Sequence, residues 1–211
     1  MSKQKKQTWH LHWNSTQNAV FERLIQRYKE KTGYLKLMNA ISDLPVGDRV
    51  LEVGAGKGMI SRQLNNKGWR SFAIDREFDV AYQNQYCLNH KYAVGDMFTL
   101  PFKAESFDMV ISCGLLEHFD AETLGRILRE MKRVGKTVVA WLPTCGIEWR
   151  TLWWLRNLAG GNVYSEAYVH TPDDLEKIFQ NVGFDKITSD VIFFSGFLRY
   201  ICICGSNRER L

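Results

Sequence analysis

The stretch Arg49-Val-Leu-Glu-Val-Gly-Ala-Gly-Lys-Gly-Met-Ile60 decides the fold of this 211-residue chain. Val50, Leu51 and Val53 within its first five residues are the β-branched or apolar side chains that a buried parallel strand requires. Gly54, Gly56 and Gly58 follow, and glycine both adopts positive φ and lets a ligand approach the backbone closely. From Met59 the pattern becomes helical, so the free N–H groups of a first helical turn would face that ligand. A strand, a glycine-rich turn and a helix in this order predict a site for a nucleotide-like cofactor.

The spacing of the glycines distinguishes between classes of cofactor. Dinucleotide-binding proteins use Gly-x-Gly-x-x-Gly, whereas this loop is Gly-x-Gly-x-Gly with an acid, Glu52, inside the strand. A phosphate-binding loop would end in Gly-Lys-Ser/Thr, and this one does not. Taken alone, the loop leaves open a nicotinamide or flavin protein, and also a turn that binds no ligand.

Three further apolar runs follow, and polar side chains stand at or just after their ends. The first ends in Asp75, where a carboxylate can accept hydrogen bonds from both hydroxyls of a ribose. The second ends in Asp96, which Met97 follows, and the third leads through Cys113 to His118. Because ligands of open α/β sheets bind at the carboxyl ends of the strands, these residues are candidates for one shared site.

The glycine loop, Asp75, the Asp96-Met97 pair and the segment 113–118 together resemble the class I S-adenosylmethionine (SAM)-dependent methyltransferases. The closest resemblance is to the broad group of small-molecule and quinone-biosynthesis enzymes. A Leu-Pro-Phe run at 100–102 fits the same pattern, and the resemblance extends from about Val50 to Leu142. It implies SAM as the cofactor and S-adenosylhomocysteine (SAH) as the product.

The resemblance also implies which residues hold the cofactor. In the family the acid after the second strand binds ribose, and the Asp-Met pair cradles adenine between a carboxylate and an apolar side chain. His118 is either a general base, since histidine titrates near neutral pH, or a residue that orients the helix or touches the methionine end of the cofactor. The expected cofactor-binding residues are Glu52, Gly54, Ala55, Gly56, Gly58, Asp75, Arg76, Asp96, Met97, Cys113 and His118.

Strand-like runs alternate with helical patterns along the chain, which indicates an α/β fold with helices on both faces of a parallel sheet. We expect a doubly wound, Rossmann-like, seven-stranded sheet, mostly parallel with an antiparallel last strand. A single domain of residues 1–211 would then comprise an N-terminal helical cap (1–44), the SAM-binding core (45–143), a lid-like insertion (144–170) and a C-terminal helix and hairpin (171–211). Thr171-Pro172 predicts the start of that last helix.

Aromatic side chains are concentrated in the insertion and near the N-terminus. A long insertion in this place usually has a function, and residues 147–158 have the pattern of an amphipathic helix. We expect a lid over a pocket for an apolar or aromatic acceptor; contact with a membrane surface or another subunit is the competing interpretation. The candidate substrate residues are Trp13, Trp149, Trp153, Tyr164, Tyr168 and His170.

Composition and cysteine usage restrict the remaining classes. The net charge of +5 gives no strong nucleic-acid signal, and five cysteines without a recognisable spacing fit neither a disulfide framework nor a zinc site. No signal peptide or membrane-spanning run is recognisable, so we expect a cytoplasmic protein with reduced thiols. Gly114 stands where some metal-dependent quinone O-methyltransferases have a glutamate, so no metal is expected.

The sequence therefore predicts a SAM-dependent methyltransferase acting on oxygen, nitrogen or carbon of a small, apolar or aromatic acceptor. Two alternatives stay open: a methyltransferase of RNA or protein, and a SAM-binding protein without catalytic activity. The fourth strand is not followed by Asn/Asp-Pro-Pro-Tyr/Phe, which argues against methylation of planar nitrogens in DNA bases or glutamine. The identity of the acceptor and the oligomeric state are not contained in these patterns.

Overall fold

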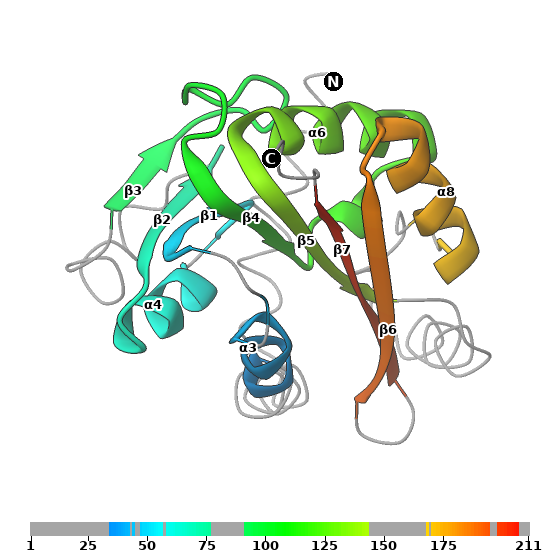
Figure 1. Ribbon diagram of the computed structural model, residues 1–211, viewed down its shortest axis with the longest axis horizontal. Coiled ribbons are helices and arrows are strands. Elements are labelled where there is room, and N and C mark those ends of the chain that lie inside the picture. Colours follow the sequence, from blue (N-terminus) through cyan, green and yellow to red (C-terminus); the bar gives the residue numbers. More distant parts are fainter. Residues whose placement is uncertain are drawn as a thin grey trace, which may run out of the picture.

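A computed structural model describes residues 34–42, 44, 47–56, 58–76, 91–143, 168, 170–194 and 198–206. These residues form one seven-stranded sheet with helices on both faces (Figure 1). The strands are β1 (Arg49–Val53), β2 (Arg70–Asp75), β3 (Lys91–Val94), β4 (Phe107–Cys113), β5 (Gly135–Pro143), β6 (Lys186–Phe194) and β7 (Leu198–Ser206).

The strand order is β3-β2-β1-β4-β5-β7-β6. All pairings from β3 to β5 are parallel, whereas β7 runs antiparallel to both β5 and β6. The predicted mostly parallel sheet with an antiparallel last strand is therefore confirmed. The order changes direction at β1 and β4, and such a switch point is where an open α/β sheet binds its ligand.

Successive residues of each strand face opposite sides of the sheet, and this alternation builds two cores. Leu51 and Val53 pack on the side covered by α6 (Ala121–Val134) and α8 (Pro172–Val182). Val50 packs on the other side, with α3 (Tyr34–Ser42) and α4 (Met59–Asn66). Figure 1 shows the sheet between these two pairs of helices.

Helix ends follow the local chemistry of the sequence. The Thr171 hydroxyl accepts from the Asp174 amide while the Asp174 carboxylate accepts from the Thr171 amide, which closes a capping box at the start of α8. The helix ends at Gly183, whose φ of 87° is left-handed. Asp120 caps α6 by accepting from the Thr123 amide at 2.8 Å. The predicted start of the C-terminal helix is thus confirmed.

Strand boundaries differ slightly from the prediction. The strand predicted to end in Asp96, β3, is Lys91–Val94, because Asp96 has left the ladder and bridges Thr99 in a tight turn. β6 begins at Lys186, two residues after Phe184, whose buried ring stacks on Phe179 of α8 at 5.1 Å between centroids.

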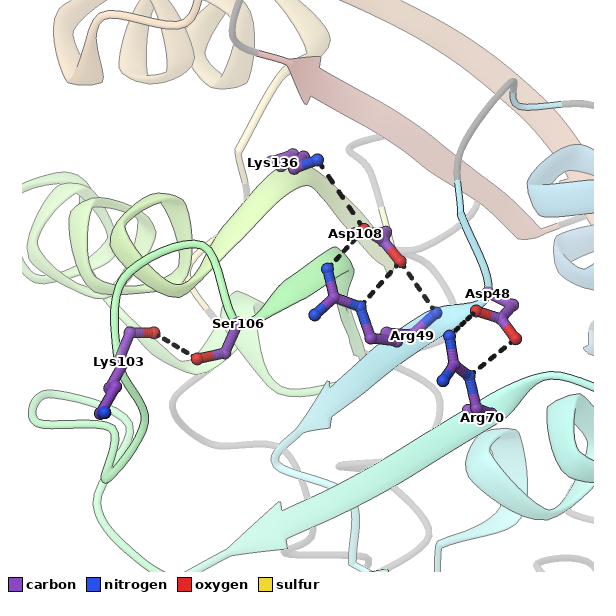
Figure 2. Close-up of polar contacts among 7 residues, drawn as sticks. All are labelled: Asp48, Arg49, Arg70, Lys103, Ser106, Asp108 and Lys136. Carbon is purple, nitrogen blue, oxygen red and sulfur yellow. Dashed lines mark hydrogen bonds and ion pairs between the residues drawn. The ribbon is translucent and has the colours of Figure 1, made fainter.

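Charged residues join the amino ends of the central strands (Figure 2). The Asp108 carboxylate on β4 accepts from Arg49 through its Nε at 3.2 Å, its Nη2 at 3.0 Å and its main-chain N at 3.2 Å. Lys136 at the start of β5 lies 4.0 Å from Asp108, and Asp48 pairs with Arg70 at the start of β2. These contacts hold the edge of the sheet opposite the glycine loop.

Parts of the expected domain plan lie outside the described residues. These are residues 1–33 of the N-terminal cap and nearly all of the insertion. The division into cap, core, insertion and C-terminal part therefore stays a prediction. Among the helices that the structure describes, none is long and apolar enough to cross a membrane.

Candidate cofactor site

The glycine loop after β1 is held against the end of β2. Gly54, Gly56 and Gly58 have φ values of 70°, 50° and 66°, a region that glycine adopts at little cost. The amides of Gly54 and Ala55 both donate to the Ile74 carbonyl, at 2.9 and 3.1 Å. A Cβ on Gly54 would overlap the Leu115 side chain. Glycine is therefore required there both by φ and by space.

Asp75 and Tyr92 fix the centre of this loop. Oδ2 of Asp75 accepts from the Gly56 amide at 2.8 Å, and the Tyr92 hydroxyl donates to the Gly56 carbonyl at 2.8 Å. A carboxylate has about four acceptor positions, so the bond to Gly56 does not by itself prevent Asp75 from contacting ribose hydroxyls. Sequence reasoning missed Tyr92, since a tyrosine in an edge strand has no local signal for a partner 36 residues away.

Glu52 lies beneath the loop and joins β1 to α4. Its side chain is only 4% exposed, and Oε2 accepts from the Ser61 amide at 2.7 Å. Burial raises the pKa of this carboxyl to about 7, because charge is disfavoured away from water. Glu52 therefore supports the loop through the first turn of α4, and direct contact with a cofactor stays a prediction.

The turn after β3 is packed tightly against β2. The Gly95 amide donates to the Asp75 carbonyl at 3.0 Å, and a Cβ on Gly95 would lie 2.7 Å from Ile74 Cδ1. Oδ1 of Asp96 accepts from the Phe98 amide at 2.9 Å, which closes the turn. Asp96 and Met97 are both half-buried. The expected adenine-binding pair thus lies next to the expected ribose-binding acid. Arg76, which directly follows that acid, is exposed.

The segment after β4 approaches the same loop. Gly114 has a φ of 70° and its amide donates to the Trp141 carbonyl on β5 at 3.0 Å. The Leu115 side chain packs against Gly54, and the next residues form a short 3-10 helix, η2 (Leu116–His118). Cys113 and His118 are half-buried. The four groups of residues that the sequence singled out therefore meet at one edge of the sheet.

Two of the six candidate substrate residues lie within the described residues. The Tyr168 amide donates to the Glu117 carbonyl at 2.7 Å, and its side chain is 46% exposed. The His170 ring is buried, with Nε2 2.9 Å from the Phe119 carbonyl. Tyr168 thus attaches the end of the insertion to η2, and His170 attaches it to Phe119, the residue that follows η2. His170 faces the protein backbone here, and its contact with an acceptor stays a prediction.

The other four candidate substrate residues, Trp13, Trp149, Trp153 and Tyr164, lie outside the described residues. The same holds for Lys57 inside the glycine loop. In the part of the chain that the structure describes, no three His, Cys, Asp or Glu side chains are grouped so as to hold a metal ion.

Comparisons with known proteins agree with this geometry. Residues 51–138 match a family model described as a methyltransferase domain. An uncharacterized methyltransferase of Staphylococcus carnosus is 29% identical over 98 residues, which is 46% of this chain and 46% of that protein. The matching stretch thus spans about half the length of that relative.

Solved structures resemble the chain over most of its length. Magnesium protoporphyrin IX methyltransferase from Synechocystis, with bound SAH, has a TM-score of 0.68 at 18% identity and covers 95% of this chain and 94% of that one. A SAM-dependent methyltransferase of Thermotoga maritima, described as a possible histamine N-methyltransferase, has a TM-score of 0.66 at 19% identity and covers 89% and 98%. Identities this low establish the Rossmann-like fold alone, and the family model adds a match to a methyltransferase domain over residues 51–138.

Proposed function

We propose that the protein transfers a methyl group from SAM to a small acceptor molecule, and this proposal proceeds from the match of residues 51–138 to a family model described as a methyltransferase domain. One observation carries the proposal. The glycine loop, Asp75 and the Asp96 turn stand side by side at one edge of the sheet, joined by the bonds of Gly56 and Gly95 to Asp75.

Each group has a distinct role in this proposal. The glycine loop gives the methionine part of SAM access to the backbone, since no Cβ stands in the way. Asp75 accepts from the ribose hydroxyls. The Asp96 carboxylate accepts from the exocyclic amine of adenine, and Met97 packs against the ring. Glu52 supports the loop from below through its bond to Ser61.

Methyl transfer from a sulfonium needs alignment more than activation. The S–CH₃ bond breaks as the acceptor atom forms its new bond to carbon, and the electron pair stays on sulfur as neutral SAH leaves. The protein contributes mainly by holding the nucleophile in line. When the acceptor carries a proton at working pH, His118 at the end of η2 is the proposed base. Orienting the methionine end of SAM is its alternative role.

A small acceptor is favoured over RNA or protein by two observations. The net charge of +5 is modest for a nucleic-acid enzyme, and aromatic residues are concentrated in the insertion of residues 144–170. Two of the similar structures also have a small molecule in their names: magnesium protoporphyrin IX in one, and histamine, as a possible substrate, in the other. A cytoplasmic location with reduced thiols belongs to the same proposal.

Calorimetric titration tests the proposal directly. We expect purified protein to bind SAM and SAH with micromolar affinity and to leave NAD unbound, and Asp75→Ala to weaken SAH binding. Release of SAH in the presence of candidate acceptors then identifies the substrate. Binding of NAD without any response to SAM or SAH would overturn the proposal. Binding of SAH with no turnover across oxygen, nitrogen and carbon acceptors would favour a SAM-binding protein without catalytic activity.

A further inference from the structure

The loop that follows the Asp96 turn is attached to α6 by two side chains. Oε1 of Glu130 accepts from the Leu100 amide at 2.7 Å. Nη2 of Arg133 donates to the Leu100 carbonyl at 2.9 Å, and its Nη1 donates to the Phe102 carbonyl at 2.8 Å. Both polar groups of the Leu100 main chain are therefore bonded to one helix.

Glu130 and Arg133 also bond to each other, so they form one unit. Arg133 donates to the carboxylate through Nε at 2.8 Å and through Nη2 at 2.7 Å. The pairing lowers the pKa of Glu130, which keeps the carboxylate charged. Only a planar guanidinium presents several donors in fixed directions. A lysine at 133 would retain the charge without reaching the carboxylate and two carbonyls together.

The attachment matters because Leu100 is buried and belongs to no strand. Its side chain is 4% exposed, and buried main-chain groups need partners. The opposite end of the same turn is held where the Gly95 amide donates to the Asp75 carbonyl. The turn that carries Asp96 and Met97 is therefore fixed at one end by β2 and at the other by α6. Arg126, also on α6, lies over the Phe98 ring within the turn, 5.2 Å from its centroid.

We propose that Glu130 and Arg133 are positioning residues for the adenine end of the cofactor. They act through the Leu100 main chain, which sets where the turn places Asp96 and Met97. The inference rests on the proposed function, because it takes these two residues as the adenine contacts. Loosening the attachment is expected to lower affinity for any ligand that carries adenosine while leaving the glycine loop intact.

The first experiment compares two probes by calorimetry: SAH, and 5′-methylthioadenosine, which lacks the amino-acid end. We expect Arg133→Lys to weaken both by about tenfold and by the same factor, as loss of well-placed hydrogen bonds predicts. Glu130→Gln keeps an oxygen for the Leu100 amide and should weaken both by about threefold. Arg129→Lys is the matched control, since Arg129 is exposed on the same helix, and should bind like the wild type. Thermal unfolding of each variant shows whether it is folded.

A double-mutant cycle separates positioning from general support of the fold. The effect of Arg133→Lys should shrink when Asp96→Asn is already present, because both changes act on the same adenine contact. It should persist in full when combined with Asp75→Asn, which acts on the ribose. Equal coupling to both would show a general structural role and overturn the inference.

The failures of the two proposals are distinguishable. A wild type that binds neither SAH nor 5′-methylthioadenosine would overturn the proposed function and this inference with it. A wild type that binds both, with folded Arg133→Lys and Glu130→Gln variants of unchanged affinity, would overturn the inference alone. If Arg133→Lys does not fold, Glu130→Gln decides between these outcomes.

Discussion

The Gly56 amide lies 2.8 Å from Oδ2 of Asp75, so the acid expected to bind ribose also holds the glycine loop. The two residues are 19 positions apart in sequence: Asp75 ends β2, and Gly56 lies in the loop that follows the neighbouring parallel strand β1. A change at Asp75 is therefore expected to alter both the contact with ribose and the shape of the loop.

The two functions of Asp75 can be separated by substitution. Asparagine retains an oxygen that can accept from the Gly56 amide, whereas alanine does not. We expect Asp75→Asn to weaken SAH binding by about tenfold through its contact with ribose, and Asp75→Ala to weaken it several-fold further through the loop as well. Calorimetric Kd values measure both. Equal affinities of the two variants would show that the bond to Gly56 adds nothing to binding.

Gly54 is expected to be intolerant of any side chain. Its φ of 70° costs a non-glycine residue about 1 kcal/mol, and a Cβ would in addition overlap Leu115. We expect Gly54→Ala to reduce the free energy of unfolding by more than Gly68→Ala, measured by urea denaturation. Gly68 is the control because its φ of 87° is also positive while its Cβ position is open. Adding Leu115→Ala to Gly54→Ala should restore part of the lost free energy of unfolding. Equal losses for Gly54→Ala and Gly68→Ala would show that the overlap with Leu115 has no effect.

Glu52 should make stability depend on pH around neutrality. Burial raises the pKa of its carboxyl from an ordinary 4.5 to about 7. The folded protein therefore holds the proton more tightly than the unfolded chain. The contribution of Glu52 therefore lowers the stability of the folded protein as pH rises from 4.5 to 7. Above pH 7 the carboxyl is ionised in both states, and the loss of stability is complete.

Glutamine at this position removes the charge and keeps an oxygen for the Ser61 amide. We expect the free energy of unfolding of Glu52→Gln, relative to that of the wild type, to rise by about 3 kcal/mol between pH 4.5 and pH 8. Urea denaturation of both proteins at pH 4.5, 6 and 8 measures the difference. The contribution of all other titrating groups cancels in this comparison. A difference that does not change with pH would show that the carboxyl keeps its ordinary pKa.

Asp108 is expected to stabilise the amino edge of the sheet (Figure 2). Its bond to Arg49 lowers the pKa of the carboxyl below 3.8. The stabilisation is thus present above that value and is lost as pH falls through the lowered pKa. We expect Asp108→Asn to lower the free energy of unfolding by about 1 to 2 kcal/mol at pH 7. The difference from the wild type should become smaller in acid.

Asp48→Asn is the matched control for that experiment. Asp48 forms a similar pair with Arg70, but their side chains are 48% and 65% exposed, and exposed pairs contribute little. Urea denaturation should show a clearly smaller effect for Asp48→Asn. Equal effects would show that partial burial of Asp108 does not increase the contribution of its ion pair to stability.

Much of the cofactor site could be predicted because its signals are local. A run of apolar residues, three glycines at alternate positions and an acid after the next strand are contained in short stretches of sequence. Thr171 and Asp174 likewise predict a helix start within four residues. The fold class was confirmed, and the match of residues 51–138 to a methyltransferase-domain model agrees with the family resemblance. SAM as the cofactor belongs to the proposed function. The acceptor stays a prediction.

The partners of the site residues could not be predicted in the same way. Tyr92 reaches Gly56 only because β3 lies beside β2, and Arg133 reaches Leu100 only because α6 packs over the turn. The sequence spacing of each pair, 36 and 33 residues, carries no signal of contact. The partner of His170 was likewise not foreseen: its Nε2 lies 2.9 Å from the Phe119 carbonyl, and its contact with an acceptor stays a prediction.

The sequence by itself determined which elements form, where the glycine loop stands and which acids follow the strands, because backbone preference and hydrophobic period act between near neighbours. Only the tertiary structure decided which of these elements lie side by side. The strand order brings Asp75 to Gly56 and places Glu52 under α4, where burial rather than residue type raises its pKa. Such properties depend on what surrounds a side chain, and distant parts of the chain supply those surroundings.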